Sequence, residues 1–287
     1  MIPHPSDVLN CGRFRLDLSL PRIMAIVNVT PDSFSGDGLA HDTDAALARA
    51  EAAVEAGADL LDIGGESSRP GSAPVSEQEE LDRVMPLLER LAGWPVPVSI
   101  DTVKPGVMRA AVAAGAAMIN DINGFRAPGA IEAVAGSKAA LCVMHMQGEP
   151  RTMQQAPQYA DVVAEVLDFL HQRCGMLHAA GVGDERIVLD PGFGFGKALE
   201  HNLALLRSLD RFRATGLHVL IGVSRKTMLG AITGRPVDQR VPAGLAAALM
   251  AVERGARIVR THDVAATRDV LAVWQAVSGC AQGVRGS

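Results

Sequence analysis

The length, composition and charge of the chain exclude several classes of protein. Its 287 residues fit one large barrel or two small domains, and a hydrophobic content of 48% excludes disorder of the whole chain. The net charge of −5 and the 3% of aromatic residues argue against nucleic-acid binding, which needs a basic face or stacking platforms. We therefore expect no nucleic-acid partner.

The cysteine spacing and the lack of long apolar runs indicate a cytoplasmic protein with no membrane partner. The cysteines form no CxxC pair, which predicts free thiols rather than a zinc site or a disulfide framework. The N-terminal residues lack the basic start and apolar core of a signal peptide. No apolar run reaches the roughly 18 residues that suggest a membrane span. The four cysteines are Cys11, Cys142, Cys174 and Cys280.

In chain order, the first expected element is a short hairpin over residues 8–18. Apolar residues alternate there around Asn10-Cys11-Gly12, which we interpret as the turn. Such a hairpin could cover the bottom of a barrel.

Short apolar runs and helical stretches then alternate almost to the end of the chain. The runs are continuous in apolar residues, as is typical of parallel strands covered on both faces. The eight predicted strands are Ile23–Val27, Leu60–Ile63, Val96–Ile100, Met118–Asn120, Leu141–Met144, Ile187–Leu189, Val219–Gly222 and Ile258–Arg260. The predicted helices include Asp44–Ala56, Glu77–Leu91, one that begins at Pro105, Tyr159–Ala180, and a last one capped by Thr261 or Asp263.

Eight βα units form either a closed barrel or an open doubly wound sheet. Eight is the number of the barrel, so we predict an α/β fold, a (β/α)8 TIM barrel with a short N-terminal hairpin. We expect one domain over residues 1–277. The small polar residues 278–287 are predicted to be a disordered tail.

Polar or charged residues follow every predicted strand. In such barrels the catalytic residues lie at the C-terminal ends of the strands, so this asymmetry predicts an active site at that rim. The residues at the strand ends include Asn28, Glu66, Asp101, Asn120, His145, Asp190, Lys226 and His262.

The residue types at the rim suggest two subsites. Asn28, Arg260 and His262 follow the first and last strands, which are neighbours in a closed barrel, and the last helix begins beside them. Together they form a candidate anion site. The second set, at the mouth of the barrel, suits the donors and acceptors on the edge of a flat heterocycle. It consists of Asp101, Asn120, Asp190 and Lys226.

Ordinary structural roles compete with these assignments. An aspartate after a strand, such as Asp190, could cap a helix, and Lys226 alone could be solvated. We interpret Asp62, which lies within a strand, as a buried structural carboxylate, and His145 as a packed residue. The glycine-rich run 191–197 lacks the spacing of a phosphate-binding Walker loop.

Several ordered motifs resemble those of the dihydropteroate synthases, from about Ile23 to Val277. The first two motifs together are very specific. The matching segments are Asn28–Ser35, Asp62–Gly71, Ser99–Thr102, Ile119–Ile122, Asp190–Lys197, Ser224–Lys226 and Arg260–Val264.

The resemblance implies a pterin diphosphate and 4-aminobenzoate as substrates, Mg²⁺ as cofactor, and commonly a homodimer. It implies that the pterin contacts Asp101, Asn120, Asp190 and Lys226, with Met144, Ile122 and Phe195 as apolar contacts. The diphosphate would contact Asn28, Arg260 and His262, with Asn28 as the metal ligand. The aminobenzoate would be bordered by Phe34, Ser68, Arg69, Pro70 and Ser224. Sulfonamides should compete at that subsite by analogy.

The mechanism expected from the resemblance breaks the C–O bond to diphosphate before the arylamine attacks. Asp101 and Asp32 would stabilise the positive charge on the pterin, Lys226 would complete the catalytic set, and no general base is assigned. Two departures are Ser68 in place of the usual threonine and the order Gly36-Asp37 in the first loop. Three alternatives are a corrinoid-dependent methyltetrahydrofolate methyltransferase, a non-catalytic pterin-binding paralogue, and a Schiff-base aldolase that uses Lys226.

Overall fold

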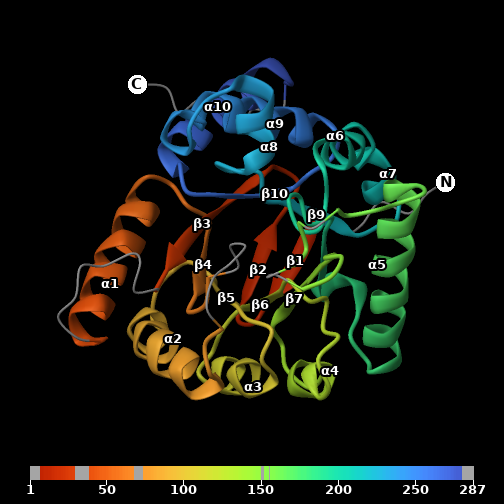
Figure 1. The fold of residues 1–287 in the computed structure, drawn as a ribbon. Helices are drawn as coiled ribbons and strands as arrows, with labels where there is room; N and C mark the ends of the chain where they lie inside the picture. The colour runs from red at the N-terminus through yellow and green to blue at the C-terminus, as the bar shows by residue number, and fades with distance from the viewer. Residues whose placement is uncertain (1–6, 30–38, 68–73, 150–151, 155, 280–287) are drawn as a thin grey trace.

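The computed structural model describes residues 7–29, 39–67, 74–149, 152–154 and 156–279, and the side chains of 39–42 are not described (Figure 1). Within these residues, eight parallel strands close into a barrel in the order β10-β3-β4-β5-β6-β7-β8-β9. The strands are β3 Arg22–Asn28, β4 Leu60–Gly64, β5 Val98–Asp101, β6 Met118–Asp121, β7 Ala140–Met144, β8 Ile187–Asp190, β9 His218–Ile221 and β10 Ile258–Thr261. The prediction of a (β/α)8 barrel is confirmed.

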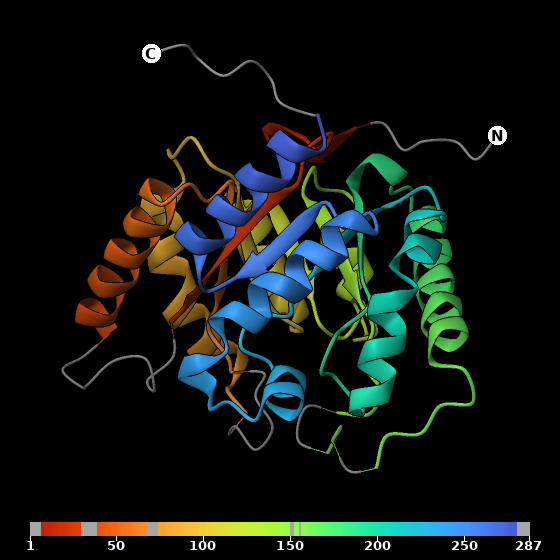
Figure 2. The same ribbon diagram turned by 90° about the horizontal axis from the view of Figure 1, so that it is seen from above.

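Helices surround the barrel and cover its outer face (Figures 1 and 2). They are α1 Leu39–Glu55, α2 Glu77–Leu91, α3 Pro105–Ala113, α4 Ala130–Val134, α5 Val162–Ala179, α6 Leu199–Arg207, α7 Leu209–Arg213, α8 Thr227–Thr233, α9 Val241–Glu253 and α10 Val264–Val277, with short 3-10 turns at Asp184–Arg186 and Val237–Gln239. None of the helices in the described residues is both long and apolar enough to cross a membrane.

Local chemistry sets the ends of several helices. α2 has the predicted bounds, and the hydroxyl of Ser76 accepts the N–H of Glu79 at its start. α5 begins later than predicted because Asp161 caps it, accepting N–H groups from Val163 and Ala164, each at 3.0 Å. The carboxylate of Asp263 makes no cap at α10 and instead contacts Arg225. The final predicted tail begins as a turn at residues 278–279, and residues 280–287 lie outside the described part.

The N-terminal hairpin closes one end of the barrel (Figure 2). β1 Val8–Cys11 pairs with β2 Phe14–Asp17, so the turn falls after Cys11 and the predicted centre at Asn10-Cys11-Gly12 is wrong. Gly12 has a φ of +60°, which suits glycine at a tight turn. Leu9, Cys11 and Leu18 pack onto inward-facing strand residues such as Met24 in a single buried cluster. The expectation that the hairpin covers the bottom of the barrel is therefore confirmed.

Side-chain alternation along the strands divides the barrel interior into an apolar lower layer and a polar upper layer. In β4, for example, Leu60 belongs to the lower interior cluster and Leu61 to the helix-facing core, so Asp62 points inward above Leu60. Ser99 and Asn120 lie in corresponding inward positions on β5 and β6. The polar layer adjoins the C-terminal rim, where the candidate site lies.

Candidate active site

An arginine links two carboxylates across the barrel interior. Arg260 of β10 donates from Nε to Asp62 Oδ2 at 2.6 Å and from Nη2 to Asp101 Oδ2 at 2.9 Å. Asn120 Nδ2 also donates to Asp62 Oδ2, at 3.2 Å. Asp62 is fully buried, as predicted for a structural carboxylate. Burial opposes the charge of Arg260, but Asp62 and Asp101 outweigh it and raise the pKa of the guanidinium.

This arrangement shifts the expected grouping of the rim residues. Sequence reasoning placed Arg260 with Asn28 and His262 in an anion subsite. The structure instead brings its guanidinium to Asp101, which belongs to the predicted heterocycle set, and to Asp62. Arg260 therefore lies between the two predicted subsites, and contact with an anion remains a prediction.

The carboxyl group of Asp101 titrates far from its usual range. Burial, and to a lesser extent the neighbouring carboxylates, raises its pKa to about 7, although Arg260 acts in the opposite direction. The folded state therefore binds this proton more tightly than the unfolded state. Its contribution to stability is fully present below the unfolded pKa of 3.8 and is lost as the pH rises through about 7.

We expect an Asp101→Asn variant to lack this pH dependence. Relative to the variant, the wild-type protein should become less stable as the pH rises from 5 to 8. Urea unfolding of both proteins at each pH measures the difference, because the ionisable groups distant from Asp101 cancel in the comparison. A difference that stayed constant with pH, or that moved the other way, would contradict the raised pKa.

A lysine and an aspartate lie at the opposite side of the mouth. Asp190 at the end of β8 is 5% exposed and accepts the N–H of Gly192 at 2.7 Å. Lys226 donates to the carbonyl of Phe193, and its Nζ lies 4.4 Å from the centre of the Phe195 ring. Burial lowers the pKa of Lys226 to about 8, against the opposing charge of Asp190. Burial likewise raises the pKa of Asp190, and Lys226 opposes that shift.

An apolar cluster borders this pair. The predicted pterin contacts Ile122 and Met144 are buried in it, and Phe195 packs against it. The structure thus brings together the apolar residues that the resemblance assigned to one ligand. Sequence reasoning missed three further members of this cluster. For Met146 the available signal was the Met-His-Met run at 144–146. These members are Met146, Met153 and Val103.

The remaining predicted anion contacts lie near the start of α10. His262 Nδ1 lies 3.1 Å from Ser224 Oγ, so Ser224, assigned to the aminobenzoate, adjoins a predicted diphosphate residue. A pocket beside them is lined by Ser224, Arg260, Thr261 and Asp263 and by apolar residues of α9. The N-terminus of α10, a helix of 14 residues, suits an anion, although the lining of this pocket combines Arg260 with the acidic Asp263.

Asn28 ends β3 and is paired with Gly64 in the sheet. A Cβ at Gly64 would lie 3.7 Å both from Asn28 Oδ1 and from the Asp101 side chain, so the two residues flank Gly64 at the rim. Sequence reasoning also selected five residues that lie outside the described part of the chain. These are Asp32, Phe34, Ser68, Arg69 and Pro70.

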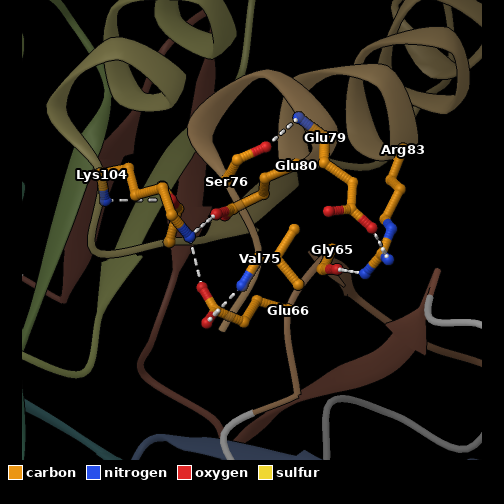
Figure 3. A network of polar contacts seen from close by, with 9 residues as sticks. Gly65, Glu66, Val75, Ser76, Glu79, Glu80, Arg83 and Lys104 are labelled. Carbon is orange, nitrogen blue, oxygen red and sulfur yellow. Dashed lines mark hydrogen bonds and ion pairs between the residues drawn. The ribbon is translucent and has the colours of Figure 1, made fainter. Parts of the chain in front are cut away.

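A second polar network, absent from the sequence-based predictions, joins β4, α2 and α3 (Figure 3). Lys104 Nζ bridges Glu66 and the buried Glu80, and Glu66 also accepts the N–H of Val75 at 3.3 Å. Arg83 donates to the carbonyl of Gly65 at 2.7 Å. Contacts thus fasten both described ends of the connection between β4 and α2.

We expect Lys104→Met to lower the free energy of unfolding by about 2 kcal/mol, because Glu80 would keep a buried charge without a cation. The matched change Arg83→Met removes a neighbouring cation whose ion-pair partner Glu79 is half exposed. That variant should lose about 1 kcal/mol or less. Urea unfolding of the two variants compares them, and equal losses would refute a special role for Lys104.

Comparisons with known proteins show the family of the chain. The profile of the pterin binding enzyme family matches residues 24–262, from within β3 to the residue after β10. The dihydropteroate synthase of Neisseria meningitidis serogroup B is 50% identical over 277 residues, covering 94% of this chain and 97% of its own length. The chain belongs to the dihydropteroate synthase family of pterin-binding enzymes.

Solved structures of the family share the whole fold. Dihydropteroate synthase of Burkholderia cenocepacia in complex with 7,8-dihydropteroate is 55% identical with a TM-score of 0.87, over 96% of this chain and 98% of that chain. The Xanthomonas albilineans enzyme with 4-aminobenzoic acid is 52% identical with a TM-score of 0.89, over 95% and 98%. The described barrel therefore has the architecture of enzymes that were solved with a pterin product and with an arylamine.

Proposed function

We propose that the protein condenses 6-hydroxymethyl-7,8-dihydropterin diphosphate with 4-aminobenzoate to give 7,8-dihydropteroate and diphosphate in folate biosynthesis. The observation that carries the proposal is the convergence of Asp101, Asn120, Asp190 and Lys226 on one barrel mouth beside an apolar wall. The relatives described above support it. Sulfonamides are then expected to compete with the aminobenzoate.

Recognition of the pterin depends on acceptors that point into the mouth. Asp190 is a buried carboxylate, and an amino group and a ring N–H can both donate to one carboxylate. Among the described residues, Asn120 Oδ1 is a buried acceptor without a hydrogen-bond partner. A buried acceptor of this kind favours a ligand that brings donors. Ile122, Met144 and Phe195 provide apolar contact for the ring.

We assign the diphosphate and its Mg²⁺ to the other side of the rim. The amide oxygen of Asn28 is the hard donor type that Mg²⁺ prefers, and Mg²⁺ is often held by one or two protein groups together with substrate phosphates. The described residues contain no group of three acidic, histidine or cysteine side chains that would form an all-protein site. Arg260 and His262 would contact the diphosphate in this assignment. Bound Mg²⁺ would balance charge on the leaving diphosphate.

The protein's own residues then act on a developing cation. The C–O bond breaks, diphosphate leaves with the bonding electron pair, and ionised Asp101 stabilises the positive charge on the dihydropterin methylene. Asp32 is a further candidate for this role. The neutral arylamine attacks the methylene carbon and afterwards loses its proton to solvent. Because an arylamine is already uncharged near neutral pH, this sequence requires no strong general base.

A turnover assay tests the proposal. Purified protein, the pterin diphosphate, labelled 4-aminobenzoate and Mg²⁺ should yield dihydropteroate, and a chelator should abolish product formation. Product without Mg²⁺ would refute the cofactor assignment. Pterin binding without product would favour the non-catalytic paralogue, and methyl transfer from methyltetrahydrofolate to a corrinoid would favour the methyltransferase.

We also propose a cytoplasmic homodimer. Among the described residues, Ile232, Val237, Met250 and Val273 are large apolar side chains that are about half exposed or more, on or between α8 and α10. Apolar surface in this region supports a subunit contact. Light scattering should give twice the chain mass of 30.1 kDa.

The cysteines described, Cys11, Cys142 and Cys174, are free thiols, which suits a reducing compartment.

A further inference from the structure

The connection between β8 and α6, residues 191–198, supplies two groups that contact Lys226. Lys226 donates to the carbonyl of Phe193, and the Phe195 ring lies beneath its ammonium group. The position of Lys226 in the mouth therefore depends on how this connection is held.

The connection lies directly against the residues that follow β7. Gly192 and Gly196 have positive φ values of 71° and 63°. A Cβ at Gly192 would overlap the carbonyl oxygen of His145, and a Cβ at Gly196 would overlap that of Gln147. Tyr159 Oη also donates to the carbonyl of Gly196 at 2.8 Å. Contact between the two segments is thus backbone against backbone, without room for a side chain.

One buried lysine joins these two segments. Lys197 is 3% exposed, and its Nζ lies 2.9 Å from the carbonyl oxygen of Phe195 and 3.3 Å from that of His145. The same Nζ lies 2.9 Å from His145 Nδ1. His145 is itself buried and packs edge-on against Phe169, with 4.9 Å between ring centres. All three contacts of Nζ thus go to the end of β7 and to the residue that underlies Lys226.

The charge environment supports a specific role for this amine. Burial lowers the pKa of His145 to about 2, so the imidazole is neutral at physiological pH. Burial also lowers the pKa of Lys197 well below its usual value. A buried amine is costly unless its hydrogen bonds are made, so ordinary packing is better served by an apolar side chain.

Arg186 provides the comparison at the opposite end of the same two strands. It precedes β8 and donates to the carbonyl of Ala139, which precedes β7, at 2.9 Å, and to the carbonyl of Ala135 at 3.2 Å. Arg186 therefore also fastens β8 to the β7 side, but far from the mouth and with a partly exposed side chain.

We propose that Lys197 is a positioning residue of the pterin subsite, which orients the Phe193 carbonyl and the Phe195 ring so that they hold Lys226. The inference rests on the proposed function in that the ligand of this subsite is a pterin. Lys197 itself contacts neither substrate in this account and acts through Phe195 and Lys226.

The test compares three variants of the full chain. Lys197→Met removes all the hydrogen bonds of the amine, Tyr159→Phe removes a single bond to the same connection, and Arg186→Met is the control at the other end of the strands. Calorimetry with the pterin diphosphate gives the dissociation constant of each. We expect a rise of about tenfold for Lys197→Met, about threefold for Tyr159→Phe and no change for Arg186→Met. Unchanged affinity in both Lys197→Met and Tyr159→Phe would overturn the proposal.

A second readout does not depend on the substrate. Acetic anhydride labelling of Lys226, quantified by peptide mass spectrometry, reports how well its amine is held and shielded. We expect Lys226 to be labelled several-fold faster in Lys197→Met than in the wild type or in Arg186→Met, and equal rates would overturn the proposal. If Lys197→Met does not fold, Tyr159→Phe decides by the same comparison. Absent turnover in the wild type would refute the proposed function but leave this labelling comparison valid.

Discussion

Replacement of Asp190 by asparagine is expected to lower kcat/KM for the pterin diphosphate by about two to three orders of magnitude. Asparagine keeps an oxygen that can accept the N–H of Gly192, so the backbone turn after β8 should survive. The lost negative charge removes charge-assisted hydrogen bonds from the pterin and sets an amide N–H against its donors, which costs about 3–4 kcal/mol. Steady-state kinetics with varied pterin diphosphate measure the effect.

Asp121→Asn is the matched control. Asp121 ends β6, is fully buried, and accepts N–H groups from Asn123 and Phe125, both at 2.7 Å. Its carboxylate supports a turn and does not belong to the proposed subsite. We expect this variant to lose about 1–2 kcal/mol of stability with kcat/KM changed by about threefold or less. Similar kinetic losses in the two variants would show that Asp190 has no specific contact with the pterin.

Arg260→Met is expected to lower the free energy of unfolding by about 3–5 kcal/mol and to reduce turnover by more than about a thousandfold. The loss of stability follows because two carboxylates, Asp62 and Asp101, would remain in the barrel interior without their shared cation. The loss of turnover follows because Asp101 would be held neutral and a predicted diphosphate contact would be absent. Urea unfolding and the turnover assay measure the two effects separately.

The pH dependence of this variant provides an internal check. Arg260 lowers the pKa of Asp101 in the folded state, so its removal should raise that pKa further. The folded variant would then bind this proton more tightly, and its stability should recover as the pH falls toward 4. Arg268→Met is the control, since Arg268 pairs with Asp59 on the outside of the barrel and is one-third exposed. It should lose about 1 kcal/mol or less and keep its turnover. No recovery of the Arg260 variant at low pH would contradict the assigned network.

The sequence predicted the strands well because buried parallel strands have a strong local signature. Ile187–Asp190 is apolar until its last residue, and Val98–Asp101 has Ser99 as its one polar residue before the final aspartate. The structure ends both strands at that aspartate. The hairpin turn was misplaced because Asn10-Cys11 resembles a turn sequence, whereas burial of Cys11 keeps it in the strand. Long-range packing of the hairpin against the barrel decided that register.

The sequence indicated which residues form the candidate site better than it indicated which contacts those residues make. Asp190 and Lys226 were grouped from their places after neighbouring strands, and Phe195 was added from the family resemblance. The structure brings Lys226 into contact with the Phe195 ring. Arg260 was grouped by its sequence proximity to His262, but its ion-pair partners lie 198 and 159 residues away. A long side chain that crosses the barrel interior leaves no local pattern.

Two lysines that pair with buried side chains show the same limit. Lys104 and Lys197 each follow a strand, and their positions in the sequence resemble those of solvated residues. Their partners Glu80 and His145 are distant in sequence and close only after the barrel forms. The polar contacts of Lys104 and Lys197 could therefore be recognised only from the structure.

A crystal structure of the protein with the pterin diphosphate and Mg²⁺ tests the central claim most directly. We expect the pterin ring to lie within hydrogen-bond distance of Asp190, Asn120 and Lys226. The diphosphate should lie toward Arg260, His262 and Asn28. A pterin bound outside the C-terminal mouth of the barrel, or one that contacts none of Asp190, Asn120 and Lys226, would contradict it.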